Sequence, residues 1–173
     1  MSPEVRGLPI EITFLPTLRT HRGKLLSRSA ALGREVHAAS FLRRRRMVLD
    51  AALKRRPREL KRILTHELFH FAWLRLGNPL RRSYEDLIRR EIRNHIKGEL
   101  GWSAESAKMN LTRGDSVRRT RRWREYVCES FCDSGASLLA GGRRHEEFTL
   151  PAAARRARRA WFVQTGLTRQ ISV

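Results

Sequence analysis

The hydrophobic and polar positions divide the chain into a strand-forming N-terminal part and a helical remainder. Residues 10–15, IEITFL, alternate apolar and polar side chains and stop before Pro16, which predicts a strand. Residues 35–41, EVHAASF, and residues 45–53, RRMVLDAAL, are two further strand candidates. We therefore expect a small mixed sheet in the N-terminal part.

From Pro57 onward the apolar residues recur every three to four positions, which is the spacing of amphipathic helices. A first helix is expected from Pro57, with Gly77 and Pro79 as its stop. Four more helices are expected: from Ser83 to about Lys97, a short one from Ser103, a long one capped by Ser116 and reaching Gly141 and Gly142, and one from Pro151 to near Gly166. Strands followed by helices predict an α+β fold, as one domain over residues 1–173.

The first predicted helix carries an H-E-x-x-H motif in the stretch THELFH. Residues four apart stack on one face of a helix, so His66 and His70 can direct two imidazoles to one point, with Glu67 beside them. Two neutral imidazoles are good zinc ligands, and a nearby carboxylate can accept a proton from water. The alternative is that both histidines are core residues, but Glu67 would then be a costly buried carboxylate on an apolar helix.

A catalytic zinc normally has three protein ligands, so a third must come from elsewhere. In the stretch REYVCESFCD, Glu125, Glu129 and Asp133 follow at four-residue steps on one face of the long predicted helix. Acidic groups on a helix that is otherwise apolar require a cation. That cation is either a metal shared with the two histidines or an arginine from another segment.

The pair HELFH and CESFCD resembles the gluzincin class of zinc metallopeptidases, the thermolysin-like group. The resemblance covers about a third of the chain and implies a zincin-like fold that hydrolyses peptide bonds. It implies that His66, His70 and Glu129 bind one Zn²⁺ per chain, that Glu67 is the general base, and that Asp133 orients a ligand histidine. An orienting carboxylate has a physical reason, because a metal-bound imidazole usually donates its other N–H to an acceptor.

The sequence departs from the pattern of this class in two respects. Glu129 follows His70 by 59 positions, which is long for thermolysin-like enzymes, and Cys128 stands where their pattern has asparagine. The third ligand therefore has alternatives, and a histidine there would indicate the SprT-like group instead. These alternatives are Glu125, His95 and His145.

The segment 45–53 also resembles the edge strand on which zincins bind their substrate. An extended peptide could add to such a strand through backbone hydrogen bonds. No spacing in the sequence selects the residue that stabilises the oxyanion, for which Tyr126, His145 or an arginine is available. The oligomeric state is not predicted.

The net charge changes the range of partners. The chain has 37 Lys and Arg against 17 Asp and Glu, a formal charge of +20. Such a charge suits an acidic peptide or protein substrate, and it equally suits nucleic acid. The competing function is therefore a nucleic-acid-associated protein, either a SprT-like DNA-associated protease or a basic nucleic-acid-binding module with structural zinc. Several of these arginines, Arg118 to Arg124, crowd the start of a predicted helix, where the macrodipole disfavours cations.

The cysteine content and the chain start predict a cytoplasmic protein. Only Cys128 and Cys132 are present, four positions apart, which favours reduced thiols over a disulfide framework. The first residues lack the basic and apolar regions of a secretion signal, and no run of 18 apolar residues predicts a membrane span.

Overall fold

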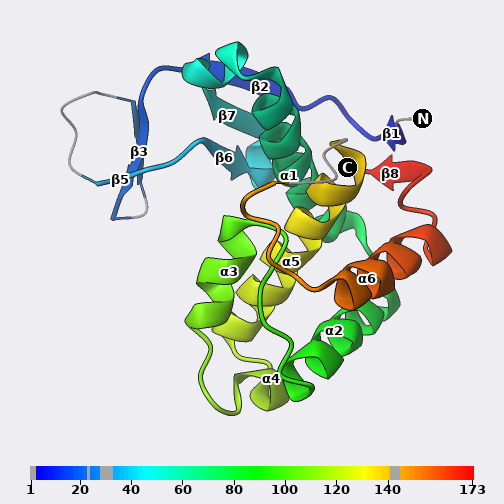
Figure 1. Cartoon of the computed structure of the whole chain (residues 1–173). Helices are drawn as coiled ribbons and strands as arrows, with labels where there is room; N and C mark the ends of the chain where they lie inside the picture. The colour runs from blue at the N-terminus through cyan, green and yellow to red at the C-terminus, as the bar shows by residue number, and fades with distance from the viewer. Residues whose placement is uncertain (1–2, 23, 28–32, 141–144) are drawn as a thin grey trace.

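The computed structural model describes residues 3–22, 24–27, 33–140 and 145–173. The strands are β1 (Glu4–Arg6), β2 (Glu11–Leu15), β3 (Leu18–His21), β4 (Lys24–Ser27), β5 (Arg34–Glu35), β6 (Ala38–Phe41), β7 (Arg46–Asp50) and β8 (Gln170–Ser172). The helices are α1 (Pro57–Arg75), α2 (Asn78–Arg93), α3 (Trp102–Met109), α4 (Asp115–Arg118), α5 (Arg121–Leu139) and α6 (Ala152–Gln164). Strands precede most of the helices, so the α+β class is confirmed (Figure 1).

Three small sheets form from these strands. β7 lies at the centre of the first sheet, in which it pairs parallel to β2 and antiparallel to β6. β3 pairs antiparallel to β4 and β5 in a second sheet, which projects from the body at the left of Figure 1. β1 and β8 pair parallel to each other and thereby join the two ends of the described chain.

The position of β7 corrects the prediction for segment 45–53. The segment is not an edge strand, because both of its sides are paired, and the edge strands of this sheet are β2 and β6. β7 also ends at Asp50, whose side chain accepts a hydrogen bond from the amide of Ala52 (2.8 Å) and so caps a short 3₁₀ helix, Ala51–Arg55. Local capping therefore ends the strand three residues early.

The predicted strand over residues 35–41 is two strands in different sheets. β5 pairs with β3, whereas β6 pairs with β7, and the chain changes sheet at Val36 and His37. The backbone amide of Val36 donates to Leu18 (3.0 Å) and the carbonyl of His37 accepts from Asp50 (2.8 Å). These two hydrogen bonds satisfy backbone groups where the chain passes from one sheet to the other. The chain can therefore change sheet within a segment that was predicted as one strand.

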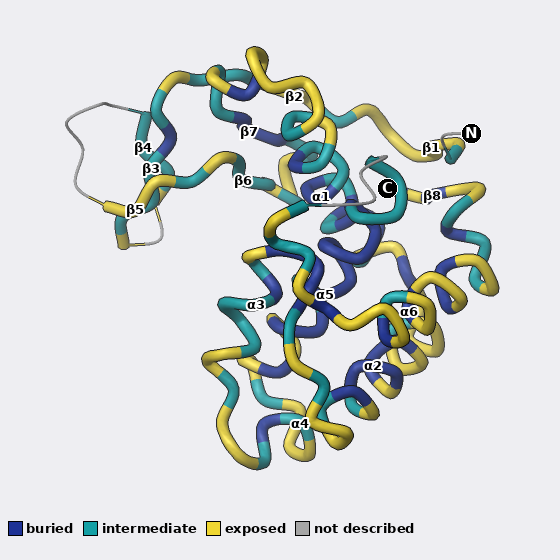
Figure 2. Tube along the Cα trace, in the orientation of Figure 1, coloured by how far each residue is buried: buried dark blue, intermediate teal, exposed yellow. Residues whose placement is uncertain are grey.

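The helices pack around α5, which is the most buried of them (Figure 2). α1 crosses α5 closely, because a Cβ at Gly135 would lie 2.7 Å from the ring of Phe69. Aromatic side chains from four helices fill the space between them: Phe69, Trp73, Tyr84, Phe131, Trp161 and Phe162. This core fixes the relative position of α1 and α5, the two helices that carry the predicted site.

The stop predicted for the first helix is close, because α1 ends at Arg75, two residues before Gly77. Both boundaries predicted for the second helix are wrong. α2 begins at Asn78 instead of Ser83, with Pro79 in its first turn, and ends at Arg93 instead of near Lys97. A proline suits the first turn of a helix because an amide there has no partner within the helix. Ser103 is close to a true start, since α3 begins at Trp102.

The predicted long helix from Ser116 begins later. Ser116 lies in the short helix α4, which ends where Arg119 adopts a left-handed conformation (φ 50°). Thr120 then caps α5 by accepting a hydrogen bond from the amide of Trp123 (3.4 Å). α5 ends at Leu139, and the predicted end at Gly141 and Gly142 lies outside the described residues. The last helix, predicted after Pro151, is confirmed.

Among the described residues, none of the helices combines the length and the apolar character needed to cross a membrane.

Candidate metal centre

The motif residues lie in the middle of α1, opposite the second half of α5. His66 and Glu67 are buried, and His70 is half-buried. The two imidazole rings lie edge to face, with centroids 4.9 Å apart. The spacing of four residues therefore places both rings on one face of the helix, as predicted.

Glu129 from α5 faces both histidines. Its two carboxylate oxygens lie 3.4 Å from Nε2 of His66 and 3.9 Å from Nε2 of His70. Bonds of about 2.0 Å in a tetrahedral zinc site place neighbouring donor atoms about 3.3 Å apart. Each Nε2 atom thus lies near one oxygen of Glu129, at about 0.1 Å and about 0.6 Å beyond this separation.

The opposite nitrogens of both rings already have partners. Nδ1 of His66 lies 2.7 Å from Oδ1 of Asp133 and donates to it, since a carboxylate only accepts. Nδ1 of His70 lies 3.6 Å and 3.4 Å from the sulfurs of Cys128 and Cys132. Each ring therefore presents its Nε2 atom to Glu129. The hydrogen bond from His66 to Asp133 is of the kind that orients metal-bound histidines in other proteins.

Cys132 is a further potential ligand that the sequence did not identify. Donor atoms of His66, His70 and Cys132 lie within 4.8 Å of one another. Burial raises the pKa of the Cys132 thiol well above its usual value, which disfavours the thiolate that a metal requires. Cys132 approaches Nδ1 of His70 alone, whereas Glu129 approaches Nε2 of both rings, so we favour Glu129 as the third ligand. Both thiols are free, in agreement with the sequence.

The electrostatics of this cluster favour positive charge. Burial opposes the charged form of His66, but the hydrogen bond and negative charge of Asp133 raise its pKa well above the usual value. The pKa of His70 is also raised against the effect of burial, by the Cys128 contact and the charge of Glu129. Conversely, the pKa of Glu129 is lowered, because its hydrogen bond to His66 and the charge of His70 outweigh burial.

No arginine or lysine supplies that positive charge in the described part of the chain. The salt bridges of Glu129 and Asp133 go to the two histidines alone, and Glu67 has none. Arg62 on α1 interacts electrostatically with Asp133, but its ion pairs are with Glu59 (2.5 Å) and Glu147 (3.1 Å). The donor set and its charge therefore fit a divalent metal ion, and they disfavour the arginine alternative.

Glu67 points to β6, one of the two edge strands of the sheet. Its Oε2 atom accepts a hydrogen bond from the hydroxyl of Ser40 on β6 (2.5 Å). Ser40 gave no signal in the sequence, because a serine in a strand is ordinary and its partner lies 27 positions away. The contact fixes the carboxylate of Glu67 beside a strand that has one unpaired edge in this sheet.

Loop residues support Asp133 from the other side. Its Oδ2 atom accepts a hydrogen bond from the amide of Ala104 in the first turn of α3 (2.9 Å). The backbone of Gly101 lies so close that an added Cβ would be 2.3 Å from Cγ of Asp133. Neither contact was predicted, since a glycine before a helix is common and nothing in the sequence links it to α5.

The three alternative third ligands lie elsewhere. Glu125 is exposed and pairs with Arg121 (2.7 Å), and His95 is exposed after the end of α2. His145 contacts Glu59 (3.3 Å) in a separate cluster with Glu147, whose donor atoms lie within 4.8 Å of one another. Arg62 already neutralises both carboxylates of that cluster.

Comparisons of this chain with protein-family models, with curated proteins and with solved structures find no match.

Proposed function

We propose that this protein is a zinc-dependent metallopeptidase with a zincin-like arrangement of the gluzincin type. The observation that supports it most strongly is the convergence of two Nε2 atoms and the Glu129 carboxylate, with no arginine or lysine paired to that carboxylate among the described residues. Two histidines and one glutamate are the ligand set of one class of catalytic zinc sites, which keep a fourth position for water. One zinc ion per chain is expected.

His66, His70 and Glu129 would hold the metal. Zinc, when bound, supplies polarisation of the scissile carbonyl and lowers the pKa of a water molecule at the site to about 7. Asp133 accepts a hydrogen bond from the Nδ1–H group of His66, which keeps the proton on Nδ1 and leaves Nε2 free as a ligand. The thiols at Nδ1 of His70 restrict the rotation of the second ring.

Glu67 acts as the general base. Its carboxylate accepts a proton from the attacking water and later passes it to the nitrogen of the leaving amine. The hydroxyl of Ser40 holds one carboxylate oxygen and thereby aims the other toward the site. A peptide that pairs with the outer edge of β6 would place its scissile bond near this group, because β6 carries Ser40 and contacts α1.

The proposal is tested by zinc content and by turnover. Elemental analysis should find one zinc per chain in the wild type, and the metal should be lost in His66→Ala and in Glu129→Ala. Cys132→Ser is the matched control and should keep its zinc. Loss of zinc in Cys132→Ser with retention in Glu129→Ala would instead assign Cys132 as the third ligand.

Glu67→Gln separates chemistry from metal binding. The amide keeps the shape and the bond to Ser40 but cannot accept a proton, so zinc should remain while peptide hydrolysis falls about 10²- to 10⁴-fold. Hydrolysis of a casein or peptide-library substrate, followed by mass spectrometry, provides the measurement. Unchanged turnover in Glu67→Gln would overturn the mechanism.

A further inference from the structure

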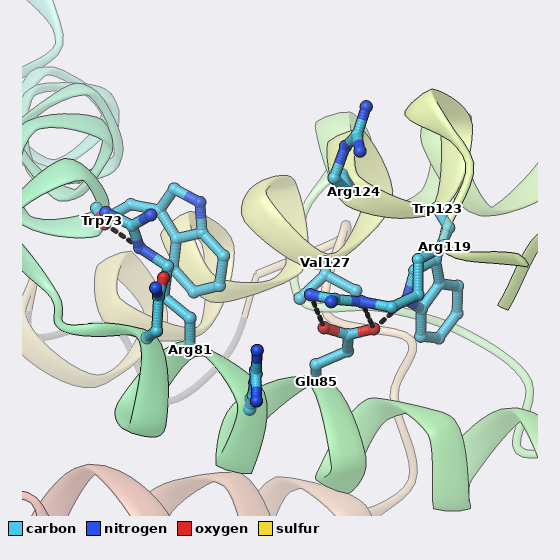
Figure 3. A pocket seen from close by; sticks show the side chains of 9 residues that line it. Trp73, Arg81, Glu85, Arg119, Trp123, Arg124 and Val127 are labelled. Atoms are coloured by element: carbon cyan, nitrogen blue, oxygen red, sulfur yellow. Dashed lines mark hydrogen bonds and ion pairs between the residues drawn. The ribbon is translucent and has the colours of Figure 1, made fainter. Parts of the chain in front are cut away.

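A cavity of about 290 Å³ lies between the last turns of α1 and the first turns of α2 and α5 (Figure 3). Trp73 and Val127 form part of its wall, and Asn78, Arg81 and Arg82 line it from α2. Trp73 lies one helical turn beyond His70 on α1. The cavity is therefore close to the candidate metal centre but shares none of its residues.

The charge of the cavity is strongly positive. Four arginines line it, Arg81, Arg82, Arg119 and Arg124, and the single acidic residue is Glu85. Glu85 is already saturated: it accepts two hydrogen bonds from Arg119 (2.9 and 2.8 Å), one from Arg89 (2.7 Å) and one from Nε1 of Trp123 (2.8 Å). Its carboxylate cannot also compensate the other arginines.

The remaining arginines are available to a ligand. Arg81 is held in place by the backbone carbonyls of Trp73 (2.9 Å) and Leu74 (2.7 Å), which orient its guanidinium without neutralising it. Arg82 and Arg124 are exposed, and neither forms a salt bridge within the described ranges. Figure 3 shows Arg124 extending from α5 with no interaction drawn to it.

The N-terminal ends of two helices add to the positive potential of the cavity. α2 begins at Asn78 and α5 begins at Arg121, so the positive ends of both macrodipoles lie beside the cavity. Arginines in these first turns are unfavourable unless an anion binds there. Two further exposed arginines, Arg118 at the end of α4 and Arg122 in the first turn of α5, lie close in the chain to the lining residues Arg119 and Arg124.

We propose that this cavity binds a backbone phosphate of a nucleic-acid strand. Two N–H groups of one guanidinium can bind two oxygens of a phosphate. Phosphates of the backbone receive most of the hydrogen bonds that proteins make to nucleic acids. The further exposed arginines at positions 118 and 122 favour a ligand with repeated phosphates over a single free anion. The net charge of +20 supports binding to such a polyanion. This inference is independent of the proposed peptidase activity.

The test measures binding of a fluorescently labelled single-stranded oligonucleotide by anisotropy over a series of salt concentrations. The double variant Arg82→Gln/Arg124→Gln should bind about tenfold more weakly or worse. The slope of log affinity against log salt should become shallower by about 1.4, or about 0.7 for each lost phosphate contact. Arg156→Gln/Arg159→Gln is the matched control, since it removes the same charge from exposed positions on α6. Its affinity should change less than about threefold, because it removes only distant charge.

Three results would overturn the proposal. Equal weakening by both double variants would show attraction to the overall charge without a site at the cavity. Competition by inorganic phosphate or a mononucleotide as strong as that of the oligonucleotide would indicate a small-anion site. Equally strong competition by polyglutamate would assign the surface to an acidic protein. Oligonucleotide binding that persists in His66→Ala would separate this site from the metal centre, whereas loss in that variant would contradict its independence.

Discussion

At the scale of single residues, Asp133 links three parts of the molecule through one carboxylate. One oxygen holds Nδ1 of His66, and the other caps the first turn of α3 at Ala104. The backbone of Gly101 packs against the same group, at a distance that leaves no room for a side chain. The orientation of His66, a proposed ligand, therefore depends on a loop that carries none of the proposed ligands.

Gly101→Ala should weaken zinc binding although residue 101 lies outside the ligand set. The new Cβ would displace Asp133, which frees the His66 ring, and the loss of such an orienting contact typically costs 10- to 100-fold in metal affinity. The measurement is a competition titration with a zinc chelator. Gly77→Ala is the control, because a Cβ there meets only Pro79 at 3.6 Å. Equal affinities in the two variants would contradict this role of Gly101.

At the scale of elements, sequence periodicity located the helices better than their ends. The apolar spacing placed α1 and α6 correctly, and the H-E-x-x-H spacing placed both imidazoles on one face. The starts predicted at Ser83 and Ser116 were wrong because a serine can cap a helix or lie inside one, and tertiary contacts decide between these roles.

The convergence of α1 and α5 could be expected only by analogy. Glu129 and Asp133 were predicted as partners of His66 and His70, and the structure brings these four residues together. The contacts of Ser40, Gly101 and Cys132 could not be predicted, because they depend on packing between segments far apart in the chain. The change of sheet at residue 36 had no sequence signal for the same reason.

Asp115 makes the joint between α4 and α5 sensitive to acid. It accepts hydrogen bonds from the amide (2.6 Å) and hydroxyl (2.8 Å) of Thr112 and from the hydroxyl of Thr120 (2.7 Å). These bonds lower the pKa of Asp115 from 3.8 to about 2, and the bond from the amide of Thr112 has the largest effect. A lowered pKa in the folded state contributes stability above the unfolded pKa, and the contribution disappears as the pH falls through the folded pKa.

Asp115→Asn should therefore flatten the dependence of stability on pH between about 4 and 2, the interval that this pKa shift defines. The wild type should lose more of its free energy of unfolding across that interval than the variant does. Urea unfolding at several pH values, followed by circular dichroism, measures the difference. Parallel curves for the two proteins would contradict the assigned role of Asp115.

At the scale of the whole molecule, one buried arginine connects most of the helical part. Arg158 on α6 donates to Glu91 on α2 (2.6 Å) and to Glu99 in the loop before α3 (2.7 Å). It also reaches the hydroxyl of Ser134 on α5 (3.3 Å), next to Asp133. Arg158 and Glu99 are fully buried, so their charges depend on each other for compensation.

Arg158→Ala should destabilise the protein by about 3–5 kcal/mol, because it leaves Glu91 without its cation and Glu99 with Lys108 alone (3.2 Å). Arg156→Ala, an exposed position on the same helix, should change the free energy of unfolding by less than about 0.5 kcal/mol. Urea unfolding of both variants at neutral pH provides the comparison. A loss below about 1 kcal/mol in Arg158→Ala would show that the network is not cooperative.

The pairing of β1 with β8 has a mechanical consequence. The two strands run parallel, with Glu4 opposite Gln170 and Arg6 opposite Ser172. A pulling force applied before β1 and after β8 would draw the strands past each other along their length, so their hydrogen bonds would carry the load together in shear. Antiparallel strands pulled in the same way would open one bond at a time. A molecular motor that pulled on both of these ends would have to separate β1 from β8 before it unfolded the helices.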